Sequence, residues 1–330
     1  SLAIDPNYAE AFNNLGNVFK DLNDFDEAIN SYKKALVIKP DYFEVHYSLG
    51  IAFKGLGQLD DMIKHLKKAV KIQPDLAEVH YRIGVGLEEL GRLHEAIKSY
   101  QKVIEINPNF IEAYNHLGII FNELGRHDEA IEAYRNALEI NPDISESHNN
   151  LGNAFKALGR YDEAIESYQK ALEINPDYPA LHNNLGSVYK EIDRLDDALK
   201  SYKNALIYNP DYPESYNNLG TTFFELERFN EAFKALKKAI EIEPEYVDAH
   251  YNLAVTFKSL DQLDEAVKSY KRAIEINPNF AEAHNNLGNV FKDLKQLDDA
   301  AKSFKKAIAI RPDYADAHNN LGNVFKDLKQ

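Results

Sequence analysis

Asparagine side chains recur at a fixed spacing of 34 residues, and their amides could bind the backbone of another chain. One column holds Asn at seven of its ten positions: Asn14, Asn150, Asn184, Asn218, Asn252, Asn286 and Asn320. A second column beside it contributes Asn17, Asn153 and Asn289. An amide offers both a donor and an acceptor, which are the groups that an extended peptide needs on each residue. Asn is also a poor helix former, so its recurrence costs stability. We therefore predict a peptide-binding surface with little sequence preference.

Amide contacts alone predict weak binding. Seven hydrogen bonds at about 1 kcal/mol each would barely offset an association cost of about 4–15 kcal/mol. The column is interrupted at Ser48, Arg82 and His116, and apolar and aromatic residues gather there. We predict one anchor patch of Tyr47, Ile51, Tyr81, Arg82, Val85 and Ile119, and a smaller one of Phe224, Tyr251 and Val255. Buried aromatic residues and Arg are the residues enriched at binding hot spots. The alternative for the asparagines and both patches is drift on a tolerant, solvated surface.

The histidines do not predict a metal site. Most of them form one column: His46, His80, His148, His182, His250, His284 and His318. Consecutive members lie 34 or 68 residues apart, in different helices, so no pair has the i, i+4 spacing of a helix-borne metal site. The chain has no cysteine, and no phosphate-binding loop, nucleophile elbow or dinucleotide fingerprint is present. We predict half-buried packing histidines, no cofactor and no catalytic constellation in this chain.

Charge limits the classes of partner. The formal net charge of −15 disfavours a nucleic-acid backbone or an anionic membrane surface as the ligand. No apolar run is long enough to span a bilayer, and no leader is evident, so we expect a soluble, cytoplasmic protein. A stripe of lysines that includes Lys20, Lys190 and Lys258 often lies beside acids, and we interpret it as self-compensated charge.

The elements that must position these columns follow from the period. Prolines recur 34 residues apart from Pro6 to Pro312, and only Pro179 and Pro213 fall outside the series. A sustained period of this length is typical of a solenoid. We predict nine units at 9–42, 43–76, 77–110, 111–144, 145–178, 179–212, 213–246, 247–280 and 281–314. Residues 1–8 match the tail of a truncated repeat, and residues 315–330 match the first helix of another.

Two apolar stripes at helical spacing in each unit predict a helical hairpin. Gly57, Gly91, Gly125 and Gly159 recur between the two helices, as expected of a left-handed residue that ends a helix. An aspartate that is followed by an acid three residues later, as Asp41 is by Glu44, predicts a capping box at the start of the first helix.

A glycine column inside the first helix, from Gly16 to Gly322, predicts a neighbouring helix in close contact, because mid-helix Gly costs about 1 kcal/mol relative to Ala. We expect the alanine column that includes Ala28 to face it. Met62 interrupts that column and predicts a wider or shifted contact.

The Leu–Gly pair, the following aromatic, the alanine, the second aromatic and the proline resemble the tetratricopeptide repeat (TPR) family. The resemblance covers essentially the whole chain. It implies an all-α fold, a right-handed α-solenoid superhelix whose first helices line a concave groove. The asparagine column is similar to that of the O-linked N-acetylglucosamine transferases.

Three functions follow as expectations. The first is a non-catalytic module that binds an extended protein or peptide segment in the groove. The second is the substrate-recognition arm of a larger glycosyltransferase. The third is a scaffold that self-associates through the apolar edge of its last helix, which carries Leu321, Val324, Phe325 and Leu328.

Overall fold

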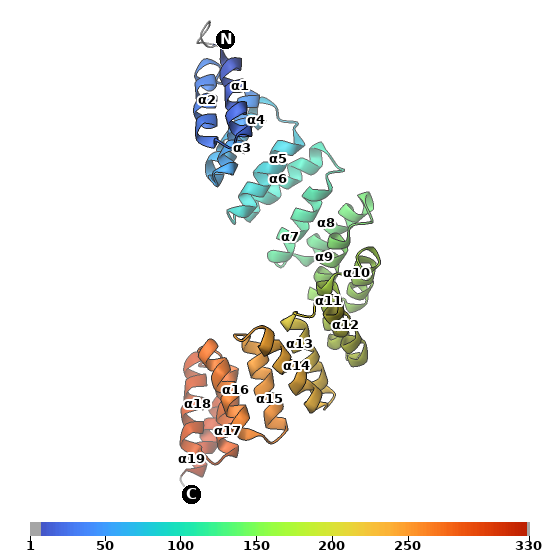
Figure 1. The fold of residues 1–330 in the computed structure, drawn as a ribbon, viewed down its shortest axis with the longest axis vertical. Coiled ribbons are helices and arrows are strands. Elements are labelled where there is room, and N and C mark those ends of the chain that lie inside the picture. The colour runs from blue at the N-terminus through green and yellow to red at the C-terminus, as the bar shows by residue number, and fades with distance from the viewer. Residues whose placement is uncertain (1–7, 329–330) are drawn as a thin grey trace. The chain divides into compact units, whose positions relative to one another are not determined.

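The protein is an all-α solenoid in the computed structural model, which describes residues 8–328 (Figure 1). No strand occurs within these residues. The first helices of the repeats are α1 (Ala9–Asp21), α3 (Phe43–Gly55), α5 (Ala77–Glu89), α7 (Ile111–Glu123), α9 (Ser145–Ala157), α11 (Pro179–Glu191), α13 (Pro213–Glu225), α15 (Val247–Ser259), α17 (Ala281–Asp293) and α19 (Ala315–Asp327). The second helices are α2 (Phe25–Ile38), α4 (Leu59–Ile72), α6 (Leu93–Ile106), α8 (His127–Ile140), α10 (Tyr161–Ile174), α12 (Leu195–Tyr208), α14 (Phe229–Ile242), α16 (Leu263–Ile276) and α18 (Leu297–Ile310).

The chain divides into two compact units, with the division between Arg160 and Tyr161. Helices α1–α9 belong to the first unit and α10–α19 to the second. Within each unit the two helices of a repeat pack together, and each second helix also packs on the next first helix. Most of the predicted repeat tail, residues 1–7, and the last two residues lie outside the described part of the chain.

The turn between the two helices of a repeat uses one left-handed residue. Glycine fills it at four repeats, with φ of +69° to +70°, which confirms the prediction from the glycine column. The remaining described turns use Asn23, Asp193, Glu227, Asp261 and Lys295, with φ of 56° to 62°. These five turns therefore adopt the same geometry at the steric cost of a side chain in the left-handed region.

The capping-box prediction is wrong. The residues that precede the first helices are aromatic or aliphatic, such as Tyr42 and Leu76, and their side chains make no capping hydrogen bond. The aspartates lie one residue further upstream. Asp24 does cap its helix, α2, where its Oδ1 accepts from the backbone N of Glu27 at 3.3 Å. The out-of-series prolines Pro179 and Pro213 begin α11 and α13, where a missing N–H costs nothing.

Most mid-helix glycines are in close contact as predicted, but they face a large side chain of the second helix, not the alanine column. A Cβ on Gly16 would lie 2.4 Å from Cε1 of Tyr32, and one on Gly186 would lie 2.7 Å from Cε1 of Tyr202. Gly50 and Gly220 face Leu66 and Leu236 instead, and Gly322 has nothing within 4 Å. The rings in this column are fully buried: Tyr32, Tyr100, Tyr134, Tyr168, Tyr202, Tyr270 and Phe304. A glycine in close contact therefore makes room for one ring or one leucine at the centre of its hairpin.

Met62 is accommodated by a glycine that the sequence analysis did not connect with it. A Cβ on Gly86 would lie 2.1 Å from Cε of Met62. Other repeats place Ala, Ile, Thr or Val at the position of Gly86. The extra volume of Met62 on α4 is thus offset by the missing side chain on α5.

The histidine column has a structural role. In all seven members Nε2–H donates to the carbonyl of the proline six residues earlier, at 2.8–3.2 Å. These bonds connect each first helix to the loop that precedes it. The predicted packing role is consistent with this geometry, and no group of three or more His, Asp or Glu among the described residues could hold a metal ion.

Candidate peptide-binding face

The asparagine column lies on the first helices, on a surface that we call the ladder face. It comprises the column from Asn14 to Asn320 and the two columns beside it, which begin at Asn13 and Asn17. Asn14 is exposed, and the other members of the main column are half-buried. First helices of neighbouring repeats contact each other directly, as α13 does with α15 and α17 with α19. The face is therefore continuous within each unit.

In the second unit the main column makes hydrogen bonds to the preceding repeat, always to the residue 35 positions earlier. Nδ2 of Asn218 donates to Oδ1 of Asn183 at 3.0 Å, and Nδ2 of Asn252 donates to Oδ1 of Asn217 at 2.9 Å. Two further rungs follow in register: Asn286 to the hydroxyl of Tyr251 at 2.8 Å, and Asn320 to Asn285 at 3.1 Å. These asparagines thus form a ladder between repeats.

The ladder changes what the amides can offer to a ligand. One N–H of each rung is used inside the protein, so it is not free to bind a peptide carbonyl. Asn218 and Asn252 keep their Oδ1 and one N–H without a partner among the described residues. Because the rung fixes the amide plane, these remaining groups have a set direction, which reduces the ordering cost of binding.

The neighbouring column is more deeply buried and supports the rungs. Asn183 is 2% exposed. Its Oδ1 also accepts from the hydroxyl of Ser215 at 3.0 Å, and its Nδ2 donates to Oε1 of Glu214 at 2.9 Å. Every polar atom of the Asn183 amide is therefore bonded, which satisfies a buried polar group. This supporting role follows from the contacts between repeats and cannot be read from the spacing alone.

In the first unit the same register holds different chemistry. The guanidinium of Arg82 lies 5.8 Å from the ring centroid of Tyr47, and its Nη2 is paired with Glu78 at 2.6 Å. The hydroxyl of Tyr81 donates to Nε2 of His116 at 3.1 Å. The interruption predicted at Arg82 and His116 is therefore a change of rung type, from amides to rings and ions.

The His116 rung continues into a small polar cluster. Nδ1–H of His116 donates to Oε2 of Glu88 at 2.9 Å, and the hydroxyl of Tyr100 donates to the same oxygen at 2.7 Å. Burial alone would raise the pKa of Glu88, but these two hydrogen bonds bring it below its ordinary value. Burial and the Glu88 carboxylate raise the pKa of Tyr100. The cluster therefore stabilises the ionised carboxylate of Glu88 in a partly buried position.

The predicted anchor residues are placed as follows. Tyr47, Ile51, Tyr81 and Val85 are half-buried, and Ile119 is 37% exposed. Tyr251 belongs to the ladder itself through Asn286, and its ring also packs edge-on against Tyr270. Phe224 lies 5.3 Å from the ring of Phe229.

The remaining predicted amides are not equivalent. Asn17 accepts from the hydroxyl of Tyr32 at 2.8 Å, and Asn150 accepts from Asn149 at 3.2 Å. Asn153 and Asn184 are half-buried and engaged in interactions. Asn289 is half-buried and makes no side-chain hydrogen bond to the described residues.

Lysines beside the ladder are paired across repeats. Nζ of Lys190 lies 3.1 Å from Glu225 and donates to Thr221 at 2.9 Å, and Lys258 lies 3.3 Å from Asp293. The interpretation of this stripe as compensated charge fits these pairs, and Thr221 is a ladder-face residue that the sequence analysis did not select.

Hairpins that stack through buried rings and present a polar first-helix face define a helical repeat protein. The TPR repeat model matches residues 16–57, 87–125, 120–159, 152–193, 191–227, 220–261, 256–295 and 288–329. The tetratricopeptide repeat model matches residues 43–76. The chain belongs to the tetratricopeptide repeat family.

Several solved structures are similar to this chain. A crystal structure of MamA protein is 32% identical, covers 51% of this chain and 92% of its own, and has a TM-score of 0.49. The Cut9–Hcn1 hetero-tetramer of the APC/C is 15% identical, covers 96% of this chain and 76% of its own, and has a TM-score of 0.59. PilF of Pseudomonas aeruginosa is 20% identical, covers 64% and 97%, and has a TM-score of 0.57. The last two share the fold. No curated protein sequence matches significantly.

Proposed function

We propose that this chain is a protein–protein interaction module that holds an extended segment of a partner along the ladder face. The observation that carries the proposal is the row of pre-oriented amides at Asn218, Asn252 and Asn286, which recur once per repeat in one unit. Stacked helices lie about 8–10 Å apart, and an extended chain advances about 3.3 Å per residue. Each rung could therefore meet every third residue of a bound backbone, whatever its sequence.

Aromatic and apolar side chains beside the ladder supply the anchors. In the first unit these are Tyr47, Tyr81 and Ile119, and in the second they include Phe224. A partner with an apolar residue near such an anchor would gain the free energy of burying apolar surface, which contacts with the amides do not provide. The chemistry of the ligand is thus an extended backbone with occasional apolar side chains.

The test uses a pool of biotinylated random 12-residue peptides, because backbone binding should tolerate sequence. Changing Asn218, Asn252 and Asn286 together to Ala removes three contacts of about 1 kcal/mol each, so capture should fall by roughly 100-fold. Circular dichroism confirms that helicity is kept. Unchanged capture by a folded triple variant would refute the proposal.

Self-association through α19 is a second candidate, and the exposure of two of its four predicted edge residues favours it, whereas Val324 is fully buried and Leu321 is half-buried. Phe325 is 41% exposed and Leu328 is 44% exposed. Light scattering across a dilution series should show association that Phe325→Glu abolishes, and a strict monomer at high concentration would exclude it. The further alternative, an arm of a glycosyltransferase, rests on the family resemblance, and the full-length reading frame tests it.

No helix within residues 8–328 has the length and apolarity needed to cross a bilayer.

A further inference from the structure

A cleft of about 530 Å³ lies on the second-helix side of the last repeats, away from the ladder. Its floor is made by α17, where His284, Leu287 and Phe291 are each 5–8% exposed. Lys271 of α16 forms one wall, and Lys302 and Lys306 of α18 form the other. The cleft therefore combines an apolar floor with cationic walls.

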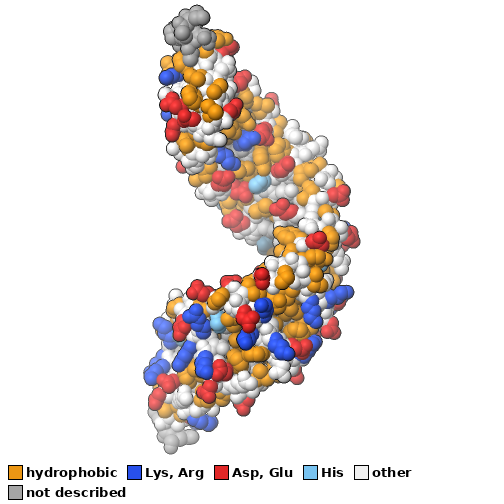
Figure 2. Space-filling view, viewed as in Figure 1, with side chains coloured by type: hydrophobic (Ala, Val, Ile, Leu, Met, Phe, Trp, Pro, Cys, Tyr) orange, Lys and Arg blue, Asp and Glu red, His pale blue; other side chains and the backbone are white. Residues whose placement is uncertain are grey.

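The same three wall positions are basic in the two preceding repeats. We call the complete set the basic stripe: Lys203, Lys234 and Lys238; Lys237, Lys268 and Arg272; Lys271, Lys302 and Lys306. All nine side chains are exposed. On the face shown in Figure 2, Lys and Arg side chains are frequent over the second unit. The stripe runs over α12, α14, α16 and α18 in a chain whose net charge is −15.

Helix stability does not require these residues. Cations near a helix C-terminus do interact favourably with the helix dipole. However, the corresponding positions of α8 and α10 include Glu132, Asn136 and Glu166, and these helices form equally well. The same wall positions are also basic in the first unit, at Lys33, Lys64 and Lys68 and at Lys67, Lys98 and Lys102, so basic walls of this kind occur in both units and are interrupted only around α8 and α10.

Neutralisation within the stripe is incomplete. Four of its members pair with an acid of their own helix: Lys238 with Glu241, Lys268 with Glu265, Arg272 with Glu275 and Lys302 with Asp299. The other five have no ion pair among the described residues: Lys203, Lys234, Lys237, Lys271 and Lys306.

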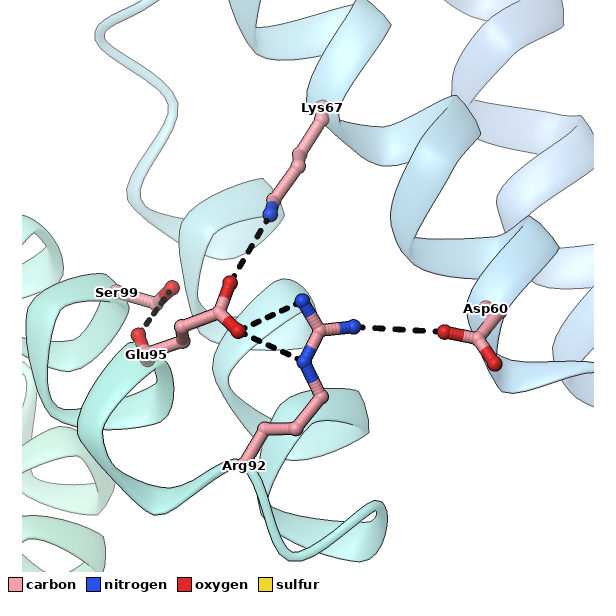
Figure 3. A network of polar contacts seen from close by, with 5 residues as sticks. All are labelled: Asp60, Lys67, Arg92, Glu95 and Ser99. Carbon is pink, nitrogen blue, oxygen red and sulfur yellow. Dashed lines mark hydrogen bonds and ion pairs between the residues drawn. The ribbon is translucent and has the colours of Figure 1, made fainter.

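In the first unit such a wall is partly neutralised, although Lys68 and Lys98 have no ion pair among the described residues. On α4, Lys67 reaches across to Glu95 of α6 at 3.5 Å, and Arg92 reaches back to Asp60 at 3.4 Å (Figure 3). Arg92 also pairs with Glu95 at 2.7 Å. This cross-helix network uses both acids and both cations. In the second unit, Asp299 is held by Lys302 of its own helix, which leaves Lys271 on the opposite wall uncompensated.

We propose that the basic stripe is a second docking surface, for an acidic segment of a partner protein that carries apolar side chains between its carboxylates. Carboxylates match the five uncompensated ammonium groups, and apolar side chains match the floor formed by Leu287 and Phe291. Glu275 and Asp299 line the same cleft and interrupt its positive charge. A peptide can place apolar side chains beside these two acids and carboxylates beside the lysines, whereas the continuous row of phosphates of a nucleic-acid backbone cannot avoid them. This surface is independent of the ladder face.

The test measures fluorescence anisotropy of a labelled 16-residue peptide with Leu at every fourth position and Glu elsewhere. The full chain should bind it, and binding should weaken as salt is raised from 50 to 200 mM. The double variant Lys271→Glu, Lys306→Glu should weaken binding at least tenfold. The matched control Lys292→Glu, Lys326→Glu makes the same charge change on first helices of the same region, and it should stay within twofold of the parent. Should the first variant lose helicity, Lys271→Gln with Lys306→Gln replaces it.

Three outcomes would overturn the proposal: no binding of this peptide by the parent chain, equal loss in the control pair, or tighter binding of a 16-base-pair DNA duplex. The triple alanine variant of Asn218, Asn252 and Asn286 should bind the acidic peptide normally. Failure of the ladder proposal and failure of this one are therefore separate results.

Discussion

Replacing Asn218 by Asp tests whether the ladder rung is real, because it changes one N–H donor into an acceptor without changing shape. The new carboxylate would face Oδ1 of Asn183, which lies 3.0 Å from the present donor. Asn183 cannot simply turn its amide around, since its own Nδ2 is bonded to Glu214 and its Oδ1 accepts from Ser215. The substitution therefore places two acceptors against each other beside a residue that is 2% exposed.

The expected cost exceeds that of a simple deletion. Removing the rung with Asn218→Ala should cost about 1 kcal/mol, the usual net value of one hydrogen bond. Asn218→Asp should cost about 2–3 kcal/mol, because a carboxylate and the Oδ1 acceptor of Asn183 are then held against each other in a largely buried site. Asn14→Asp is the matched control, since Asn14 is an exposed member of the same column and donates to no described residue. It should stay within about 0.5 kcal/mol of the parent.

Urea titration and native-state hydrogen exchange of the α13 amides measure these differences. Exchange is the more direct assay, because stability in repeat arrays is local to neighbouring units. Acid gives an internal check: once the new carboxyl is protonated it can donate to Asn183 again, so the penalty should shrink as pH falls through the pKa of that carboxyl. Equal stability of the Asn218→Asp and Asn14→Asp proteins at pH 7 would refute the hydrogen bond from Asn218 to Asn183.

Three further predictions concern packing and pH. Gly186→Ala should cost about 1–3 kcal/mol because its Cβ would meet a ring at 2.7 Å, whereas Gly322→Ala, with nothing within 4 Å, should gain up to about 1 kcal/mol; thermal unfolding measures both. Gly86→Ala and Met62→Ala should each destabilise, but in a urea double-mutant cycle the pair should cost less than the sum, because Met62→Ala removes the clash that a Cβ at position 86 makes, and that Cβ partly fills the cavity that Met62→Ala leaves. Burial lowers the pKa of His65 from 6.5 to about 4. The stability that the neutral ring contributes is therefore complete above pH 6.5, and about 3 kcal/mol of it is lost as pH falls toward 4. His65→Ser should flatten that part of the stability–pH curve, and an unchanged curve would contradict the lowered pKa of His65.

The sequence predicted the repeat fold well because the period constrains every level of structure at once. A glycine that recurs inside a helix indicates a contact with no space for a side chain, and a glycine between helices indicates a left-handed turn. Both inferences held at Gly16 and Gly57. The partner of the first was assigned wrongly, since periodicity shows that two columns exist but not which of them face each other. The ring of Tyr32, not Ala28, lies against Gly16.

The capping prediction failed for a local reason. An aspartate near a helix start suggests a cap, but the helix begins one residue later than the pattern implied, so Asp41 is outside the cap position that Tyr42 occupies. A shift of one residue is enough to remove the hydrogen bond. Such boundaries depend on how the loop packs, which the repeat pattern does not encode.

The ladder face was predicted as a set of positions, and its hydrogen bonds were not. Whether Asn218 points to solvent or to Asn183 depends on the spacing and rotation of α11 and α13, which only the three-dimensional structure supplies. The basic stripe was missed because its members lie on different helices, such as Lys271 on α16 and Lys306 on α18, and they come together only when the repeats stack.

Photocrosslinking tests the central claim most directly. A benzophenone amino acid placed at Asn289, on the ladder face, is compared with one at Val37, which is 84% exposed on α2. With the random 12-residue peptide pool, crosslinks should form from position 289, should be lost when Asn218, Asn252 and Asn286 are changed to Ala, and should be absent from position 37. Crosslinks from position 37 alone, or equal yields from both positions, would contradict binding along the ladder face.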